Sequence, residues 1–585
     1  MSHVLQHLVM PNLAFGAPEE MYARLANDRV HALMSEGRML FEPGGRASFD
    51  TFFNSVTVGA WKTHTAVTDL QLQLRGTGRF IVRLGLHRLG HAHRWLAEHV
   101  VTLTPDQDSV IPVDWAKLES GMLYFALEAL EAGSLSAGRF ATCTAPQREV
   151  KLGIVITHFN RKQWVLPAIA RIRSELLSDP LYKGRIELVV VDNSQNITTE
   201  EAEGITLIPN KNLGGSGGFT RGLLHLKDQK DFTHCLFMDD DASCEIESIR
   251  RTITLFEFSI RDDISVAGAL LRELEPWHLL DKGSNFDGYP TCDRAGLDVR
   301  GVHGLLMAET VKRKPDFGGW WFLSFPLKQL KSFSYPFFVK CDDILFGIMN
   351  DFPVATMNGV ACLSDDFGFK EGPLQRYLDT RGRVVMNLVT GEHGLFDCLL
   401  LILRFILIPL FSCNYVSTRA AIDGLKDAMK GPSFWVENIE MKSIFERISK
   451  YDSSEKMIPI DISDIELRDN QVSRENWALT VFRWLTLNGI LIPTFFRINK
   501  TIYQPKGFRG TFRQIFRFKR IFYYYEPNSK GYIVELNTIT ALLLLIKCLR
   551  EVVRYVSLHS SLKIKYQSEL TSLTSEKFWR KIYGL

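Results

Sequence analysis

Four short apolar segments in the middle of the chain constrain its fold more than any other feature. They span residues 153–157, 187–191, 205–208 and 235–238. Each is apolar on both faces, which is the pattern of parallel strands covered by helices on both sides of a sheet. Apolar residues at helical spacing follow the fourth segment and predict a helix over 244–258. The alternation of strands and helices predicts an α/β domain with a parallel sheet.

Polar or small side chains follow each of these four segments. They occupy residues 157–161, 192–194, 209–212 and 239–241. In open α/β sheets, ligands bind in the crevice beyond the carboxyl ends of the strands. Four chemically rich strand ends in one domain therefore predict a site for a nucleotide-like ligand.

Three consecutive aspartates, Asp239, Asp240 and Asp241, follow directly on the fourth segment. Adjacent carboxylates repel one another, and a hard divalent cation such as Mg²⁺ or Mn²⁺ removes that cost. Because alternate residues of an extended segment point the same way, Asp239 and Asp241 can share one face. The alternative is that the acids complement the dipole of the following helix, for which one acid would suffice. The pattern favours a metal site.

A glycine-rich stretch lies between the third and fourth segments. Residues 212–222 contain five glycines, which let the backbone approach a ligand closely and adopt positive φ. The alternative is a flexible surface loop. The stretch matches neither a Walker loop nor a regular G-x-G-x-x-G pattern, so its place between two strands is the better indication of a ligand.

The chain is longer than a single hydrophobic core usually supports, and the pattern of residue types along it changes at two points. In the first part, residues 52–74 and 79–86 flank the turn signal 75–78, which predicts a hairpin, and 124–129 is a further strand. This part is expected to be a β-rich sandwich or barrel. Beyond residue 390, long apolar-periodic segments with few turn signals predict a mainly helical region. The predicted domains are 1–147, 148–390 and 391–585.

The net charge and the cysteines bear on the partners and the cellular compartment of the protein. The formal net charge of +3 argues neither for nor against a polyanionic partner. Nine dispersed cysteines without a C-x-x-C pair fit a reducing compartment. The N-terminal residues lack a basic region followed by an apolar run, so no secretory signal is expected and the predicted location is cytoplasmic.

Residues 395–411 form the longest apolar stretch. It contains Asp397, Arg404 and Pro409. Central charges are expensive in hydrocarbon, so a buried or interfacial helix is expected here rather than a membrane span.

Taken together, the motifs resemble those of a known enzyme family. The series 157–161, 191–194, 212–222 and 238–241 is similar to the inverting family 2 glycosyltransferases, which have the Rossmann-like GT-A fold. The sequence of residues 212–219 and the three aspartates resemble those of the polymerising galactofuranosyltransferases of mycobacterial cell walls. The likeness extends over about the first two-thirds of the chain. It includes residues 53–54, Trp61, 318–321, 340–343 and 377–381.

The resemblance implies a reaction. A divalent metal, Mn²⁺ or Mg²⁺, assists transfer of galactofuranose from UDP-galactofuranose to a growing lipid-linked glycan, as in cell-wall or O-antigen polysaccharide synthesis. Asp343 would be the catalytic base and Asp342 would bind acceptor hydroxyls, although the pair could also simply begin a helix. Trp320 and Trp321 would stack on the acceptor sugar from an exposed loop, with core packing as the alternative.

The same resemblance implies a donor pocket. Its residues would be Thr157, Phe159, Asn160, Arg161, Asp192, Asn193, Asn212, Gly214, Gly215, Asp239 and Asp240. Thr157, Asp192 and Asn193 would line the uridine.

One position departs from the family pattern. The galactofuranosyltransferases carry a histidine as third metal ligand after a Gly-Val-Ala-like strand. Here residues 359–363 are followed by Ser364, Asp365 and Asp366. Asp365 or Asp366 could replace the histidine, or the protein could hold the metal less tightly.

A basic and aromatic segment, 496–525, lies in the last part of the chain. It contains no acid, and its cations are Arg497, Lys500, Lys506, Arg509, Arg513, Arg517, Lys519 and Arg520. Such a segment suits an anionic membrane surface or a lipid diphosphate. A solvated basic face and an RNA-binding patch are the alternatives. With a lipid-linked acceptor implied by the resemblance, peripheral attachment to the inner leaflet is preferred and no nucleic-acid partner is expected. Homo-oligomerisation stays open.

Two rival functions remain. The enzyme could transfer another sugar, such as rhamnose or galactopyranose, because the shape of the donor pocket selects the sugar and the sequence does not give that shape. A non-catalytic glycan-binding or assembly protein could keep the same fold, although binding alone requires neither the three aspartates nor Asp343.

Overall fold

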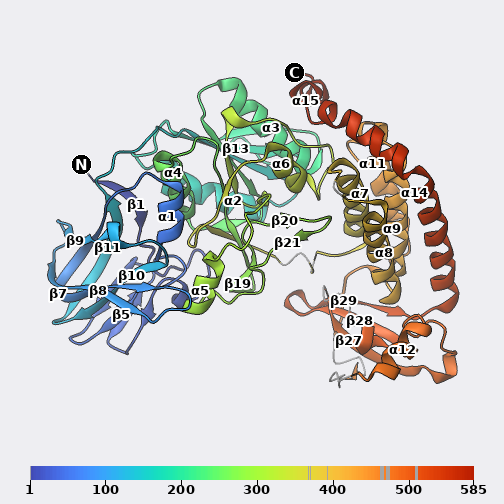
Figure 1. The fold of residues 1–585 in the computed structure, drawn as a ribbon, viewed down its shortest axis with the longest axis horizontal. Helices are drawn as coiled ribbons and strands as arrows, with labels where there is room; N and C mark the ends of the chain where they lie inside the picture. Colours follow the sequence, from blue (N-terminus) through green and yellow to red (C-terminus); the bar gives the residue numbers. More distant parts are fainter. Residues whose placement is uncertain are drawn as a thin grey trace. The chain divides into compact units, whose positions relative to one another are not determined.

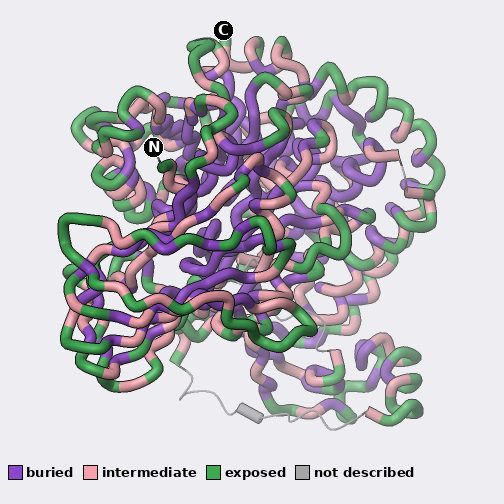
Figure 2. The backbone as a smooth tube through the Cα atoms, turned by 60° about the vertical axis from the view of Figure 1, so that its left-hand side comes forward, coloured by how far each residue is buried: buried purple, intermediate pink, exposed green. Residues whose placement is uncertain are grey.

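The computed structural model of the chain describes residues 2–365, 368, 370–391, 393–461, 467–468, 475–506 and 512–585. The chain forms two compact units (Figure 1). The first comprises Met1–Phe333 and Phe346–Ser364, and the second Ser334–Leu345 and Asp365–Leu585. Figure 2 shows which parts of the backbone are buried and which loops are exposed.

The N-terminal part of the first unit is an antiparallel β-structure, in agreement with its predicted β-rich character. Strand β10 (Met122–Ala129) contains the predicted strand 124–129. The other strands are β1 (His3–His7), β2 (Arg24–Leu25), β3 (Val30–Leu33), β4 (Arg38–Phe41), β5 (Arg46–Ser48), β6 (Val56–Thr57), β7 (Leu70–His87), β8 (Arg94–Leu103), β9 (Ser109–Val113) and β11 (Gly133–Thr142). Helix α1 (Val58–His64) follows β6.

The predicted hairpin turn at 75–78 is wrong, because β7 runs through it without a break. The first half of β7 pairs with β9 and β11, and its second half pairs with β8 and β10. The glycines lie where the partners change. A Cβ on Gly76 would lie 1.9 Å from the carbonyl oxygen of Ser134. Gly76 therefore permits a close strand contact and does not form a turn.

The α/β part of the first unit contains the predicted parallel sheet. Strands β12 (Leu152–His158), β13 (Ile186–Asp192), β14 (Thr206–Pro209) and β15 (His234–Asp239) coincide with the four apolar segments. They run parallel in the order β14-β13-β12-β15. Beyond β15 the sheet continues with β22 (Leu323–Pro326), β17 (Ser265–Ala267) and β23 (Val354–Ala355).

Helices cover both faces of this sheet (Figure 1). They are α2 (Lys162–Ile172), α3 (Gly214–Gln229) and α4 (Ile246–Phe258), the last of which confirms the helix predicted over 244–258. Because alternate strand residues face opposite sides, Val155 and Thr157 of β12 meet α3, whereas Ile154 and Ile156 join the core beneath α2 and α4.

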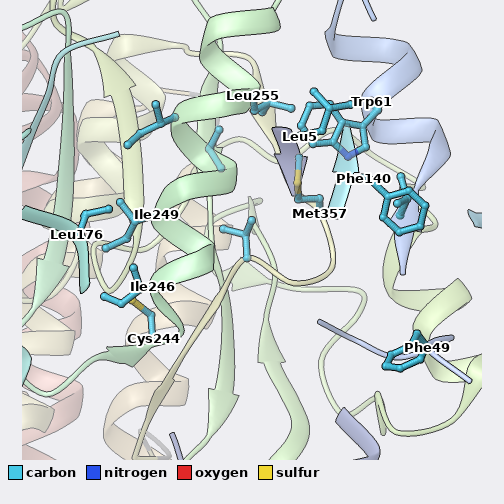
Figure 3. Packing of buried hydrophobic residues seen from close by; sticks show 14 of the residues in the cluster. Leu5, Phe49, Trp61, Phe140, Leu176, Cys244, Ile246, Ile249, Leu255 and Met357 are labelled. Atoms are coloured by element: carbon cyan, nitrogen blue, oxygen red, sulfur yellow. The ribbon is translucent and has the colours of Figure 1, made fainter. Parts of the chain in front are cut away.

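One hydrophobic core serves both parts of the first unit. Figure 3 shows Ile249 and Leu255 of α4 in the same cluster as Leu5, Trp61 and Phe140 from the N-terminal β-structure. The predicted boundary at residue 147 therefore separates two parts of the chain that differ in residue pattern but share one hydrophobic core.

Smaller elements complete the first unit. A second sheet has the order β16-β24-β18-β19, and β20 pairs with β21. Their bounds are β16 (Ser243–Cys244), β18 (Ala269–Arg272), β19 (Glu275–Asp281), β20 (Asn285–Phe286), β21 (Pro290–Thr291) and β24 (Ala361–Ser364), with helix α5 (Val302–Glu309) between β21 and β22.

The second unit is only partly the helical region that was expected beyond 390. Its helices are α7 (Pro373–Val389), α8 (Leu395–Phe411), α9 (Tyr415–Ala428), α10 (Ser433–Glu437), α11 (Lys442–Ser449), α12 (Trp477–Leu485), α13 (Phe512–Ile515), α14 (Thr538–Leu573) and α15 (Glu576–Tyr583). A mixed sheet of order β25-β29-β28-β27-β26 accompanies them. Its strands are β25 (Ile458–Pro459), β26 (Leu467–Arg468), β27 (Ile498–Pro505), β28 (Phe518–Tyr525) and β29 (Lys530–Glu535).

Helix α8 has the bounds of the apolar stretch 395–411. One of its sides, which includes Ile402 and Ile406, is buried, and Phe396 is exposed. No helix in the described part of the chain combines the length and apolar character that crossing a membrane requires.

Candidate active site

All four predicted strand ends lie at one edge of the parallel sheet. In the register of the sheet, Thr157 is opposite Asp239 and His158 is opposite Asp192. Asp192 is in turn opposite Pro209. The sheet therefore brings together the polar residues that the sequence placed after separate strands.

Arg161 joins the aspartate cluster at this edge. Its Nη1 lies 2.6 Å from Oδ2 of Asp241 and 3.2 Å from Oδ1 of Asp240. Burial lowers the pKa of Arg161, but the charges of the aspartates outweigh it and raise the pKa overall. The guanidinium thus offsets part of the carboxylate repulsion that was expected to require a metal.

His158 is a second positive partner, which the sequence analysis did not single out. Its Nδ1 lies 3.4 Å from Oδ2 of Asp240, and its Nε2 lies 3.0 Å from Oδ1 of Asn196. Burial lowers the pKa of His158, yet these two partners raise it above the usual value. The signal was present in the sequence, because His158 lies inside the polar run 157–161.

The expectation that Asp239 and Asp241 extend from one face of a strand is wrong. Strand β15 ends at Asp239, and Asp240 and Asp241 lie in a turn closed by a hydrogen bond from Ala242 N to Asp239 O at 3.2 Å. Arg161 binds the two turn residues. Carboxylate oxygens have the chemistry that Mg²⁺ and Mn²⁺ prefer. Within the described residues, however, no three acidic, histidine or cysteine side chains converge into a metal site.

Asp192 holds a loop together from its buried position. Its Oδ1 accepts hydrogen bonds from the amides of Ser194 and Gln195, and its Oδ2 from those of Asn196 and Ile197. Burial raises the pKa of Asp192, but these donors lower it overall. The carboxylate therefore stays ionised and shapes the loop next to the predicted uridine pocket.

A chain of amides connects this loop to helix α3. Asn193 Nδ2 donates to the carbonyl oxygen of Gly214 at 3.1 Å, and Asn210 Nδ2 donates to Asn193 Oδ1 at 2.9 Å. Asn212 Oδ1 accepts from the amide of Gly214 at 3.1 Å. Asn193 and Asn212, both predicted donor-site residues, thereby fix the start of α3.

The glycine-rich stretch is a helix rather than a loop. Gly214 has a φ of 66°, which suits glycine, and Gly215 continues the first turn of α3. A Cβ on Gly218 would lie 2.2 Å from Cγ2 of Thr157, and one on Gly222 would lie 2.3 Å from Cγ1 of Val155. The later glycines therefore let the helix pack closely on β12.

Thr157, Phe159 and Asn160 lie at this edge of the sheet. Within the described residues, the buried Oγ1 of Thr157 has no hydrogen-bond partner. The Phe159 side chain is 45% exposed. Asn160 has a φ of 54°, and its amide donates to Ser194 Oγ at 2.8 Å. An unsatisfied hydroxyl beside an exposed aromatic ring fits a ligand-binding edge.

The expectation that Trp320 and Trp321 lie on an exposed loop is wrong. Trp320 is 4% exposed and Trp321 is 9% exposed. The Trp320 ring packs edge-to-face against Phe219, Phe237 and Phe346. Trp321 Nε1 donates to the Gly268 carbonyl oxygen at 3.2 Å. The arrangement is that of a core, so the acceptor-binding role stays a prediction.

Asp342 and Asp343 lie in the second unit, at the start of helix α6 (Asp342–Asn350). Phe338, Lys340 and Cys341 precede them with φ values of 76°, 71° and 70°. Non-glycine residues with positive φ cost on the order of 1–3 kcal/mol each, and they concentrate at functional sites. The local backbone therefore carries strain where the resemblance places the catalytic base.

The environment of Asp343 raises the pKa of its carboxyl group. Burial raises the pKa of Asp343, and the nearby Arg383 counteracts this only in part. Its Oδ1 accepts a hydrogen bond from the amide of Ile344 at 2.8 Å. A carboxylate with a raised pKa is a stronger base than an ordinary aspartate.

Side chains of the second unit hold the strained loop. Arg381 Nη2 donates to the carbonyl oxygen of Phe337 at 2.7 Å, and its guanidinium stacks 4.2 Å from the Trp435 ring. Trp579 Nε1 donates to the carbonyl oxygen of Ser334 at 2.7 Å. The segment 377–381, noted for its resemblance, is thus structural support for the loop before Asp342.

Of the two candidates for a third metal ligand, the structure describes only one. Asp365 belongs to the second unit, whereas Asp366 lies outside the described residues. In the first unit, Leu363 of β24 pairs with Ser243 of β16, which follows the three aspartates closely.

The basic and aromatic segment 496–525 is less uniform than expected. Arg497 is buried and donates to the carbonyl oxygens of Ile490, Ile492 and Leu536. Arg513 pairs with Glu475 at 3.1 Å. Arg509 lies outside the described residues.

The comparison with protein families favours an enzyme site over a binding fold. Residues 153–277, which include β12 to β15, match the model of glycosyl transferase family 2. This segment is therefore similar to the family 2 glycosyltransferases. The match covers all four strand ends described above, the aspartate cluster included.

The chain also resembles two curated relatives. It is 26% identical over 372 residues to galactofuranosyltransferase GlfT2 of Mycobacterium tuberculosis, covering 58% of this chain and 58% of the relative. It is 24% identical over 424 residues to galactofuranosyltransferase GlfT2 of Mycolicibacterium smegmatis, covering 67% of this chain and 65% of that relative. The chain therefore spans less than two-thirds of the length of either relative.

Solved structures are similar only distantly. A mannosyltransferase of Pyrobaculum calidifontis, solved with GDP-Man and Mn²⁺, matches with a TM-score of 0.28 at 15% identity. The match covers 53% of this chain and 84% of the other.

Proposed function

We propose that this glycosyltransferase transfers galactofuranose, with inversion, from UDP-galactofuranose to a growing lipid-linked glycan, using a GT-A domain. The observation that carries the proposal is the sheet edge at which Arg161, His158 and the three aspartates meet, within a chain that resembles GlfT2. Transfer of another sugar, such as rhamnose or galactopyranose, is the alternative.

The donor would bind along this edge. The exposed ring of Phe159 offers a face for the base, and the free hydroxyl of Thr157 and the ordered amides of Asn193 and Asn196 offer polar contacts. Arg161 would bind the diphosphate, since a guanidinium suits phosphate oxygens. Binding a diphosphate requires Arg161 to share its charge between the phosphates and Asp241.

A divalent cation would be held by Asp239 and Asp241, with the diphosphate oxygens completing its coordination. When bound, it would stabilise the negative charge of the departing diphosphate. Asp365 and Asp366 stay candidates for a further ligand.

Asp343 would take the proton from the acceptor hydroxyl as that oxygen attacks the anomeric carbon on the face opposite the diphosphate. Its raised pKa suits proton transfer in the transition state. Asp342 would bind neighbouring acceptor hydroxyls. The strained loop held by Arg381 and Trp579 would keep the pair in position.

The proposed location is the cytoplasmic face of the membrane, with peripheral attachment to anionic lipid. Two features of the second unit support it. Trp477 and Phe495 are 80% and 77% exposed, and Trp484 is also exposed. Lys519 and Arg520 belong to β28 of the same unit. Exposed aromatic rings combined with basic side chains favour an anionic membrane interface.

A donor panel tests the proposal. The purified chain would be incubated with UDP-galactofuranose, UDP-galactopyranose and a rhamnose nucleotide, with and without a lipid-linked acceptor and Mn²⁺. Release of UDP and extension of the acceptor with UDP-galactofuranose alone is the expected result. Turnover of a different donor would identify that sugar as the one the enzyme transfers. Binding of glycan without turnover of any donor would favour the non-catalytic alternative.

A further inference from the structure

The second unit contains a pocket that the proposed transfer reaction does not use. It lies where the start of α7, the end of α8 and the start of α9 meet strands β28 and β29. Its lining includes Arg376, Lys506, Ser412, Ser417, Tyr523 and Tyr532. All of these residues belong to the second unit.

Lys506 gives the pocket its most distinctive charge. It follows β27, and its amide is fixed by a hydrogen bond to the Tyr524 carbonyl oxygen at 2.8 Å. Burial lowers the pKa of Lys506, and no carboxylate of the described residues forms an ion pair with its ammonium, although Glu371 lines the same pocket. A half-buried ammonium without a counter-ion is unfavourable, and an anion in the pocket would remove that cost.

Arg376 supplies a second cation that is already oriented. Its Nη2 donates to Glu371 Oε2 at 2.6 Å, and its guanidinium lies 5.8 Å from the centre of the Phe405 ring. Its side chain is 6% exposed. Among the residues that line the pocket, the two cations Lys506 and Arg376 outnumber the single carboxylate of Glu371, and Glu455 lies behind them near Arg376.

Hydrogen bonds hold the polar wall rigid. Tyr523 Oη donates to the Ser412 carbonyl oxygen at 2.9 Å, and Tyr532 Oη donates to Asn414 Oδ1 at 3.0 Å. Behind Ser417, the carboxylate of Glu455 is committed to the first turn of α9 through the amides of Val416 and Ser417. Because these hydroxyls are already donating, the donors left for a ligand belong mainly to Lys506 and Arg376.

One helix end adds to the positive potential. The N-terminus of α7, at Gly372, borders the pocket, and a helix N-terminus carries partial positive charge, whereas the N-terminus of α9 is already capped by Glu455. Ile408 and Pro409 of α8 provide an apolar side.

We propose that this pocket binds a phosphoryl group, with Lys506 and Arg376 as its cationic contacts. Two cations from separate elements match a tetrahedral, multiply charged anion better than a planar carboxylate. The group could belong to a soluble phosphate or to a lipid phosphate whose chain lies against Ile408 and Pro409, and the chemistry at the cations is the same in both cases.

Calorimetric titration of the full chain with inorganic phosphate and pyrophosphate, and with acetate for comparison, tests the site. Lys506→Met should weaken phosphate binding about tenfold or more, because a hydrogen bond to a charged group is worth about 1.5–3 kcal/mol. Lys506→Arg should retain binding. Lys530→Met, the same charge change at an exposed position of the same sheet, should have no effect.

The result that overturns the proposal is equal affinity in wild type and Lys506→Met, with both proteins folded by circular dichroism. Absence of phosphate binding to the wild type, or equally tight binding of acetate, would overturn it as well. A polyprenyl phosphate in detergent micelles identifies the source. Tighter binding than inorganic phosphate, again lost in Lys506→Met, assigns the site to a lipid phosphate, and weaker binding assigns it to a soluble one.

Discussion

The indole of Trp579 donates a hydrogen bond to the carbonyl oxygen of Ser334 at 2.7 Å, so the last helix of the chain contacts the loop that leads to Asp342 and Asp343. Trp579 is fully buried. The loop also contains strained residues, among them Lys340. A strained backbone persists only where its surroundings determine it, so this contact should matter for activity.

Trp579→Phe removes the donor and keeps most of the packing. The loss of one neutral hydrogen bond is worth about 1 kcal/mol, so hydrogen exchange of the amides in 334–345 should become faster. Turnover should fall more than donor affinity, because the loop carries the proposed base and not the donor pocket. Trp477→Phe, at an exposed tryptophan, is the control. Unchanged exchange in Trp579→Phe would mean that Arg381 alone holds the loop.

The contact between Arg161 and Asp241 predicts opposite effects of two neutral substitutions on metal dependence. Asp241→Asn removes a proposed ligand, so activity should require more Mn²⁺. Arg161→Gln removes a cation that competes for the same carboxylate, so half-maximal activity should require less Mn²⁺ while the UDP-sugar KM rises. Lys162→Gln, whose partner is Glu201, is the matched control. Full activity of the wild type in excess chelator would refute metal dependence altogether.

Asp365→Ala extends this test to the departure from the family pattern. If Asp365 supplies the missing ligand, the Mn²⁺ concentration for half-maximal activity should rise. An unchanged requirement in Asp365→Ala and in the double variant with Asp366→Ala would exclude both residues.

Asp343→Asn should lower turnover by about 10²–10⁴-fold with little change in donor affinity, since general-base assistance contributes to the transition state. Asp342→Asn should weaken acceptor binding at least as much as turnover. Single-turnover rates and acceptor KM separate the two effects. Near-normal turnover of a folded Asp343→Asn enzyme would make Asp342 the first candidate for the base.

The parallel sheet and its polar edge could be predicted from the sequence, because strands buried on both faces and their polar ends are local patterns. Helix α3 could not, since its glycines lower intrinsic helix propensity and are explained only by the close approach to Thr157 and Val155. The burial of Trp320 depends on distant aromatic partners. The positive φ of Lys340 likewise follows from tertiary contacts, which a single sequence does not display.

Gly218→Ala tests the packing explanation for the glycines. The new Cβ would lie 2.2 Å from Thr157 Cγ2, so α3 must move away from β12. Overpacking of this kind costs about 1–3 kcal/mol in the free energy of unfolding, and UDP-sugar affinity should fall with it. Gly59→Ala in α1 has open space around the added methyl group and should be neutral or stabilising. Equal urea midpoints for the two variants would contradict the explanation.

Glu455 predicts how the stability of α9 depends on pH. Burial raises the pKa of Glu455 to about 7, although hydrogen bonds from Ser417 and Val416 oppose the shift. A carboxyl whose pKa is higher in the folded than in the unfolded state stabilises the fold below its unfolded pKa, near 4.5, and this contribution is lost as pH rises towards 7. The difference amounts to about 3 kcal/mol.

Hydrogen exchange at the first turn of α9 should therefore become less protected between pH 5 and 8, after correction for intrinsic exchange. Glu455→Gln should be insensitive over this range, and Glu437→Gln, at an exposed glutamate, should behave as the wild type. If Glu455→Gln keeps the full pH dependence, another group is responsible for it.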